Sequence, residues 1–126
     1  MSNENDRPLL LEHPDWLQLS DDAVREGRTR VAVDVGDAVV GFATYLITEG
    51  TAELEDLFVA PSHMRRGIGR ALVIDISEQV RKMNYAMLEV TANPDAAAFY
   101  EYMGFEPYRL VATQGHPALR MRKPIG

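Results

Sequence analysis

The chain has 126 residues, of which 46% are hydrophobic and 25% are charged, and it carries a formal net charge of −6. This length predicts one folded domain over residues 1–126, large enough to bury about two-thirds of its unfolded surface. The chain has no cysteine, which excludes disulfides, thiolate metal sites and a cysteine nucleophile. The acidic balance argues against a nucleic-acid partner, because phosphate binding favours an excess of lysine and arginine.

Neither a membrane segment nor a secretion signal is recognisable in the sequence. No apolar run approaches the roughly 20 residues of a membrane span. The first residues, MSNENDRP, contain neither the basic nor the apolar region of a signal peptide. We therefore expect a soluble, cytoplasmic protein without a membrane partner.

The first half of the chain predicts a short helix followed by an antiparallel meander. Residues 1–14 are expected to be a loosely ordered lead, and residues 16–26 form the predicted helix. Apolar and polar residues then alternate, Gly36-Asp37 is typical of a two-residue hairpin turn, and a second break falls at residues 48–50. The predicted strands of this meander are residues 29–35, 39–47 and 52–59.

The last strand of the meander breaks the alternation that one buried face would produce. Glu53, Glu55 and Leu57 share one parity, so each face mixes charges with bulky apolar residues. A β-bulge near Asp56 and Leu57 would shift the phase and leave backbone N–H groups without ladder partners. The alternative is an edge strand whose charges lie on a solvent face.

A loop of arginines and glycines precedes a long amphipathic helix. The first N–H groups of a helix lack partners within it and carry the positive end of its dipole, so they attract anions. Gly67 and Gly69 would let a phosphate approach these groups, while Arg65, Arg66 and Arg70 add cationic donors. The spacing matches neither a Walker loop nor a dinucleotide fingerprint. The alternative is that the glycines only let the chain turn sharply into the helix.

The second half of the chain predicts a strand, helix and strand unit. Apolar residues recur every three or four positions as far as Met83, and we expect the helix to end at Asn84. A strand over residues 85–91 then lies parallel to the strand over residues 52–59. Parallel strands that flank a helix start direct a ligand site between their carboxyl ends.

The next predicted helix has signals at both ends, and two strands follow it. Asn93 can cap this helix, Pro94 can begin it, and Gly104 can close it in a left-handed conformation. The predicted final strands are residues 108–113 and 118–122, and the turn between them is residues 114–117. Together the elements predict an α/β (α+β) domain with a mixed central sheet of about six strands and flanking helices.

Two motifs of this chain resemble a known family when they are taken together. The first runs from Leu57-Phe58-Val59-Ala60-Pro61 to Arg65-Arg66-Gly67-Ile68-Gly69. The second comprises Asn93-Pro94, Ala98-Phe99-Tyr100 and Gly104-Phe105. They resemble the GNAT superfamily of acetyl-CoA-dependent N-acetyltransferases. The resemblance implies a mostly antiparallel sheet with one splayed parallel strand pair, acetyl-CoA as cosubstrate, and no metal.

The resemblance also implies where acetyl-CoA would bind. The backbone of the strand at Leu57, Phe58 and Val59 would pair with the pantetheine arm, and one of its N–H groups would polarise the thioester carbonyl. The pyrophosphate would lie on the glycine loop, and Asn93 would contact the pantetheine arm. The implied cofactor-binding residues are Leu57, Phe58, Val59, Met64, Arg65, Arg66, Gly67, Ile68, Gly69, Arg70, Ala71, Asn93, Ala98, Phe99 and Tyr100.

The implied chemistry is direct acetyl transfer to a primary amine, on a small molecule or on a protein. Tyr100 would stand beside the sulfur and protonate the departing thiolate, or it could be a buried aromatic without a catalytic role. The amine must first lose a proton, and Glu53 matches the position where some family members place a base. Glu55 is a reserve and Glu89 a weaker candidate, and any of these carboxylates could instead be a strand charge without a catalytic role.

Two features depart from the family pattern. Met64 stands where the family usually places glutamine or arginine, and few residues precede the meander. The acceptor groove is therefore expected to be open or completed by a second subunit, which suggests a homodimer. The alternative function is a catalytically weak acyl-CoA-binding sensor or interaction module. His63 and His116 are expected to be surface residues, because neither has a paired ligand in the sequence.

Overall fold

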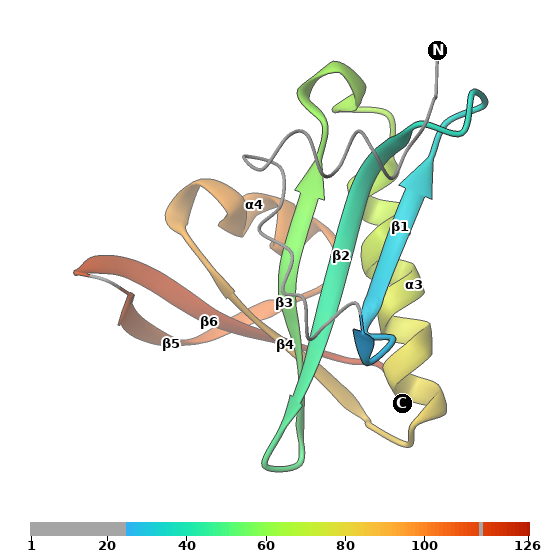
Figure 1. The fold of residues 1–126 in the computed structure, drawn as a ribbon. Helices are drawn as coiled ribbons and strands as arrows, with labels where there is room; N and C mark the ends of the chain where they lie inside the picture. The colour runs from blue at the N-terminus through green and yellow to red at the C-terminus, as the bar shows by residue number, and fades with distance from the viewer. Residues whose placement is uncertain (1–24, 114) are drawn as a thin grey trace.

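The computed structural model describes residues 25–113 and 115–126. Within these ranges the chain forms one six-stranded sheet in the order β1-β2-β3-β4-β6-β5, with two α-helices on it (Figure 1). The elements are β1 (Thr29–Val33), β2 (Val39–Thr48), β3 (Thr51–Val59), the short 3-10 helix η2 (Pro61–His63), α3 (Ile68–Lys82), β4 (Met87–Ala92), α4 (Pro94–Tyr102), β5 (Glu106–Thr113) and β6 (His116–Pro124). This confirms the predicted fold class. The predicted lead and most of the helix predicted over residues 16–26 lie outside the described residues.

An aspartate organises the loop between β1 and β2, so the predicted two-residue turn at Gly36-Asp37 is wrong. The Asp34 N–H donates to the Ala38 carbonyl, and the Asp37 N–H donates to the Asp34 carbonyl, both at 2.9 Å. The Asp34 carboxylate accepts hydrogen bonds from the N–H groups of Gly36 and Ala38 at 2.8 and 3.1 Å. Asp37, with φ 66°, takes the left-handed position that ends such a loop.

The predicted bulge is present in β3, one residue earlier than expected. Tyr45 of β2 lies opposite Leu54, whereas Thr44 lies opposite Asp56, so Glu55 is the extra residue. The inserted residue shifts the phase of the strand. Leu54 therefore points into the core, and the carboxylates of β3 lie on the other face.

Helix α3 covers the face of the sheet formed by β1, β2 and β3. Its buried residues are Leu72, Val73, Ile76 and Val80. At Gly41 of β2 the helix and sheet approach so closely that a Cβ would lie 3.2 Å from the Ile68 side chain and 2.8 Å from the Phe58 carbonyl oxygen. The helix ends at Lys82, and Asn84 follows with φ 74°, which confirms the predicted end.

Strands β3 and β4 are parallel, as predicted, but they pair over a short distance. Their ladder consists of Ala52 with Leu88, Glu53 with Glu89, and Leu54 with Val90. Beyond this point the two strands diverge, as Figure 1 shows at the upper end of β3. The predicted splayed parallel pair is therefore present.

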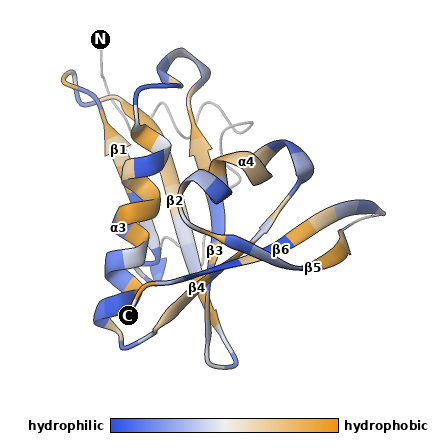
Figure 2. Cartoon of the chain, turned by 180° about the vertical axis from the view of Figure 1, so that it is seen from behind, coloured by the Kyte–Doolittle hydropathy of each residue, from blue (hydrophilic) through white to orange (hydrophobic). Residues whose placement is uncertain are grey.

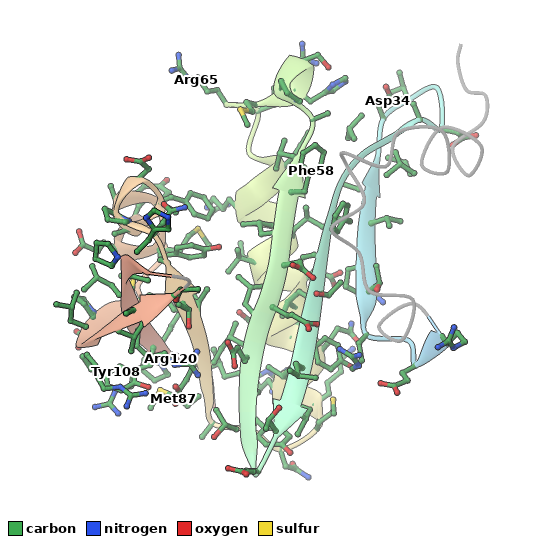
Figure 3. The ribbon with its side chains drawn as sticks, turned by 60° about the vertical axis from the view of Figure 1, so that its left-hand side comes forward. Asp34, Phe58, Arg65, Met87, Tyr108 and Arg120 are labelled. Carbon is green, nitrogen blue, oxygen red and sulfur yellow. The ribbon has the colours of Figure 1, made fainter. Side chains whose placement is uncertain are left out.

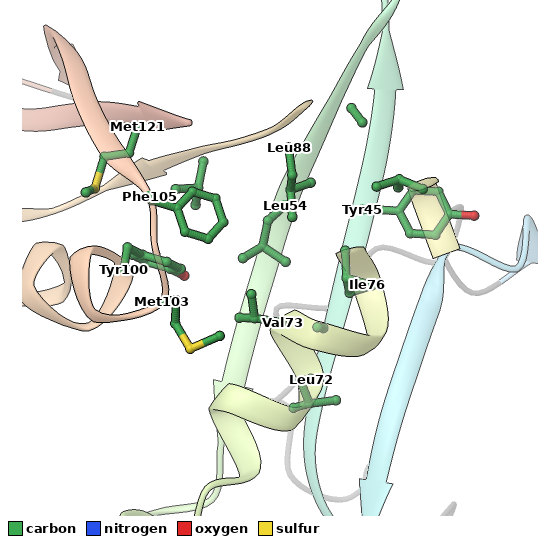
Figure 4. Close-up of a cluster of buried hydrophobic side chains, with 14 of the residues drawn as sticks. Tyr45, Leu54, Leu72, Val73, Ile76, Leu88, Tyr100, Met103, Phe105 and Met121 are labelled. Atoms are coloured by element: carbon green, nitrogen blue, oxygen red, sulfur yellow. The ribbon is translucent and has the colours of Figure 1, made fainter. Parts of the chain in front are cut away.

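Helix α4 lies on the same face of the sheet as α3, and both helices stand in front of the sheet in Figure 2. The predicted caps are confirmed: Asn93 Oδ1 accepts a hydrogen bond from the Ala96 N–H at 2.9 Å, and Gly104 has φ 98°. The Phe105 N–H donates to the Tyr100 carbonyl at 2.9 Å, which completes a Schellman-type end. Figure 4 shows Phe105 and Tyr100 packed beside Leu54 in the main hydrophobic cluster.

The two C-terminal strands are longer than predicted. β5 and β6 pair as far as Thr113 and His116, so His116 and Pro117 belong to β6 and not to the turn. β6 also pairs with β4, with Arg120 opposite Thr91. This order brings the side chains of β6 next to the carboxylates of β3 and β4.

Candidate active site

The divergence of β3 from β4 exposes a short backbone edge. The Ala60 N–H donates to the Val40 carbonyl at 2.8 Å, so the backbone of this residue points toward β2. Because residues of an antiparallel strand point alternately toward and away from their neighbour, the N–H groups of Leu57 and Val59 point away from β2. Neither residue has a ladder partner on β4. Two backbone donors therefore face the opening between the strands.

The start of α3 lies immediately beyond this edge. Gly67 is the N-cap with φ 81°, and the first hydrogen bond within the helix runs from the Ala71 N–H to the Gly67 carbonyl at 3.0 Å. The preceding N–H groups, of Ile68, Gly69 and Arg70, form no intrahelical bond. Ala71, a predicted cofactor-binding residue, uses its own N–H in the helix. The free N–H groups at this helix start can receive an anion.

Three arginines surround the start of α3 without being engaged elsewhere. Arg65, Arg66 and Arg70 are exposed and form no hydrogen bond or ion pair with any other residue that the structure describes. Figure 3 shows Arg65 extending beyond the end of β3, past Phe58. Arg65 has φ 66°, which is unusual for a residue with a Cβ. These free cations give the helix start a local positive charge within an acidic protein.

Gly69 brings the helix start, the end of β3 and α4 into contact. A Cβ at Gly69 would lie 3.4 Å from Phe99 Cζ and 3.7 Å from Val59 Cγ2, which are ordinary van der Waals distances. An alanine would therefore fit here, so close packing does not require this glycine. The predicted phosphate loop, the open edge of β3 and Phe99 consequently belong to one locality. Ala98, the neighbour of Phe99, is exposed.

Tyr100 lies in the hydrophobic cluster beside this locality, with only 7% of its surface exposed. Its ring contacts Phe99 and Phe105 edge-on, with centroids 5.2 and 5.5 Å away. Figure 4 shows the side chain extending from α4 toward β3. The hydroxyl forms no hydrogen bond with another described residue. Burial raises the pKa of Tyr100 to about 12, so the phenol stays protonated at neutral pH.

Glu53, the predicted base, is held by an arginine. The Arg120 guanidinium donates to both carboxylate oxygens of Glu53, at 2.8 and 3.4 Å, and to Glu89 at 3.0 Å. Thr91 and Tyr108 also contact this guanidinium. Figure 3 shows Arg120 and Tyr108 side by side. The structure therefore places Glu53 and Glu89 in one ion-pair network, at the end of β3 that is still paired with β4.

A second cluster of carboxylates lies where β3 leaves β4. It includes Asp56, which was not among the residues selected from the sequence. Asp56 Oδ2 and Glu55 Oε1 lie 3.0 and 3.2 Å from the Thr44 hydroxyl oxygen. Glu55 also accepts a hydrogen bond from Arg28 at 3.2 Å, whereas no described cation contacts Asp56. Burial raises the pKa of Asp56 despite the hydrogen bond from Thr44, and Glu55 raises it further. Thr44 is fully buried.

Asp56 could have been noticed from the sequence only through the bulge. Simple alternation separates it from Glu53 and Glu55, whereas the extra residue brings all three carboxylates to one face. The hydrogen-bond partner on β2 follows from a register that the sequence pattern does not determine.

His63 is not the isolated surface residue that the sequence suggested. Its ring nitrogens lie 2.8 Å from the Ser62 hydroxyl oxygen and 3.6 Å from Asp34 Oδ2. This contact connects the loop between β1 and β2 to η2, ahead of the arginines. Within residues 25–113 and 115–126, no group of three histidine, aspartate or glutamate side chains is arranged to hold a metal.

The sequence pattern of the acetyltransferase (GNAT) family matches residues 2–105. The chain belongs to this family. It is 33% identical to a streptothricin acetyltransferase of Streptomyces lavendulae, over 94% of this chain and 72% of that protein.

Solved structures with the GNAT fold agree with this assignment. Nourseothricin acetyltransferase is 28% identical, with a TM-score of 0.69 over 80% of this chain and 68% of that one. Aminoglycoside 6′-N-acetyltransferase, solved with coenzyme A, has a TM-score of 0.73 over 94% of this chain and 87% of that one. At 19% identity, this second likeness shows the shared fold. No helix in the described part of the chain is long and apolar enough to cross a membrane.

Proposed function

We propose that this chain transfers the acetyl group of acetyl-CoA directly to a primary amine. The observation that carries the proposal is the locality where β3 leaves β4. There, the backbone donors of Leu57 and Val59, the helix start at Gly67 and the buried Tyr100 of α4 belong to one locality. A thioester with a diphosphate tail has a carbonyl, an anion and a leaving sulfur to match these three features.

The backbone would hold the cosubstrate. The N–H groups of Leu57 and Val59 would bind the pantetheine arm and the thioester carbonyl, and one of them would stabilise the oxyanion that forms on attack. The N–H groups of residues 68–70 and the side chains of Arg65, Arg66 and Arg70 would receive the pyrophosphate. The helix cap uses Asn93 Oδ1, and no other described residue hydrogen-bonds to the amide NH₂, which would contact the pantetheine arm.

Transfer would occur in one displacement. The neutral amine nitrogen forms a bond to the thioester carbonyl carbon, the carbon–sulfur bond breaks, and the proton that the nitrogen loses on becoming an amide ends on the departing thiolate. The lack of cysteine disfavours a covalent acetyl-enzyme on a thiol. A phenol with a pKa of about 12 is a weak acid toward a thiolate, whose pKa is about 8.5. Tyr100 therefore acts first as a hydrogen-bond donor to the departing sulfur.

The first acceptors to test are amines related to those in the names of the similar proteins. Streptothricin is the first choice, because the sequence relative named for it is matched over most of its length. The carboxylates on the face of β3 opposite the helices support a cationic acceptor.

The decisive experiment combines binding and turnover. Calorimetry with acetyl-CoA is expected to show saturable one-site binding, and thiol release is expected with streptothricin or another primary amine but not with alcohols. Binding of acetyl-CoA without turnover on any amine would favour the sensor module instead. Absence of acetyl-CoA binding would overturn both functions.

A further inference from the structure

Thr44 makes two contacts that one hydroxyl proton cannot satisfy together. Its oxygen lies 3.2 Å from Glu55 Oε1 and 3.0 Å from Asp56 Oδ2. If both carboxylates are ionised, the hydroxyl donates to only one of them, and the other contact places two acceptor oxygens together. One additional proton on a carboxyl group turns both contacts into hydrogen bonds. The three side chains can therefore share one proton.

The surrounding charges decide which carboxyl group takes this proton. Glu55 Oε1 accepts a hydrogen bond from the Arg28 guanidinium at 3.2 Å, so Glu55 has a cationic partner. Among the described residues, Asp56 has no cationic partner, and its side chain accepts a hydrogen bond from Thr44. Glu55 and Arg28 are the charged groups of this cluster, and β2 contributes the uncharged Thr44. A proton that this cluster takes up therefore goes to Asp56, which can then donate to Thr44 while Thr44 donates to Glu55.

The side chain of Asp56 lies on the face of the sheet opposite the helices. Gly41 faces Ile68 and Leu72 of α3, so its partner Val59 faces α3 as well. By alternation, Asp56 points to the other face. In sequence it directly precedes Leu57, whose N–H faces the opening between β3 and β4. Asp56 is thus beside the expected thioester, on the side away from Tyr100.

We propose that Asp56 accepts the proton that the acceptor ammonium must lose before attack, with Thr44 and Glu55 as positioning residues that set its proton affinity. This inference rests on the proposed acetyl transfer. The proton moves from the ammonium nitrogen to Asp56 Oδ2, which leaves a neutral amine and a neutral carboxyl group. The amine then attacks the thioester, and Asp56 returns its proton to solvent after the product leaves.

Glu53 is the competing candidate, and its contacts argue against it. Both of its oxygens receive hydrogen bonds from Arg120, so this carboxylate is already engaged by a guanidinium. Glu53 also lies where β3 and β4 are still paired, farther from the opening than Asp56. A raised pKa of Asp56, caused first by burial, supports its role as the base.

The test is the pH dependence of kcat/KM for four variants and the unaltered protein, with acetyl-CoA and the best amine of the panel. Asp56→Asn is expected to lower kcat/KM by about 10²-fold or more while Glu53→Gln stays within about tenfold. Thr44→Val removes a hydrogen-bond donor to the Asp56 carboxylate. It is expected to move the acid limb of the profile, where kcat/KM falls as Asp56 takes up a proton, to higher pH. Glu55→Gln removes a neighbouring negative charge and is expected to move it to lower pH.

Thr29→Val is the matched control for Thr44→Val. Thr29 lies opposite Thr44 in the ladder of β1 and β2, and its buried hydroxyl has no hydrogen-bond partner within residues 25–113 and 115–126. The same substitution at Thr29 is expected to leave the acid limb unchanged. Acetyl-CoA binding to each variant, measured by calorimetry, checks that it is folded.

The outcomes separate this inference from the proposed function. If the unaltered protein acetylates no amine, the proposed function fails and the role of Asp56 fails with it. If the unaltered protein is active but Asp56→Asn keeps its rate and its acid limb, only the role of Asp56 is overturned. Loss of activity in Glu53→Gln with full activity in Asp56→Asn would assign the base to Glu53.

Discussion

Leu54 lies opposite Val90 in the last pair of the parallel ladder between β3 and β4, and both side chains are buried in the same hydrophobic cluster. Tyr100 and Phe105 of the α4 region belong to that cluster. The core thus holds the two strands together up to this pair and places α4 beside the point where they part. The exposed backbone of the proposed site is a consequence of how these apolar side chains pack.

Tyr100→Phe is expected to lower kcat by about 10²-fold with little change in acetyl-CoA affinity, because the variant loses only the hydroxyl that we propose as the hydrogen-bond donor to the departing sulfur. Stability should change little, since no other described residue hydrogen-bonds to this hydroxyl. Steady-state kinetics and calorimetry measure both quantities. Tyr45→Phe, at another buried tyrosine of the cluster, should leave kcat unchanged. An unaltered kcat in Tyr100→Phe would remove Tyr100 from the mechanism.

Gly67→Leu is expected to weaken CoA binding by about 10-fold or more, because a side chain at the helix start interferes with charge-assisted contacts to the pyrophosphate. Gly50→Leu is the matched control. Both glycines have φ 81° and open space around the position of a Cβ. Each substitution should cost roughly 1–2 kcal/mol of stability through left-handed strain. Equal loss of affinity in both variants, or none in either, would discredit the phosphate loop.

Asn93 can be tested separately as a helix cap and as a cofactor ligand. Asn93→Ser keeps an oxygen that can cap α4 but loses the amide NH₂, so CoA affinity should fall while the unfolding free energy is retained. Asn93→Ala should lose affinity and also about 1 kcal/mol of stability. Urea denaturation and calorimetry provide the measurements. Normal CoA affinity in Asn93→Ser would limit this residue to its capping role.

Asp56→Asn is expected to stabilise the protein at neutral pH. Because burial raises the pKa of Asp56, the folded protein binds a proton that the unfolded chain has already released, at pH values between the ordinary aspartate pKa and the raised one. The stability of the unaltered protein therefore falls as pH rises through this interval, whereas the variant lacks this contribution. The difference in unfolding free energy, variant minus unaltered, should grow with pH and then level off. A constant difference from pH 3 to pH 8 in urea titrations would show that Asp56 has an ordinary proton affinity.

The sequence predicted the elements well where local chemistry determines them. Asn93, Pro94 and Gly104 define both ends of α4, because caps depend on neighbouring backbone groups. The apolar spacing defined α3, and Asn84 marked its end. The mixed charges of β3 correctly indicated a bulge.

Contacts between distant strands were beyond sequence reasoning. Arg120 reaches Glu53 only because β6 inserts between β4 and β5, a strand order that no local signal specifies. Asp56 acquires Thr44 as a partner only through the register after the bulge. The loop at Asp34 was missed because a side-chain oxygen, and not Gly36, holds the turn. In each case, the interaction that decides the structure joins residues that no recognisable sequence pattern connects.

The most direct test of the central claim is a titration of acetyl-CoA into ¹⁵N-labelled protein, followed through the backbone amide resonances. The amides of Leu57 and Val59 and those of residues 68–70 are expected to shift and to saturate together, because both groups bind one ligand. The amides of β5, on the far edge of the sheet, should stay unchanged. Unshifted Leu57 and Val59 amides at saturating acetyl-CoA would contradict a thioester site between β3 and β4.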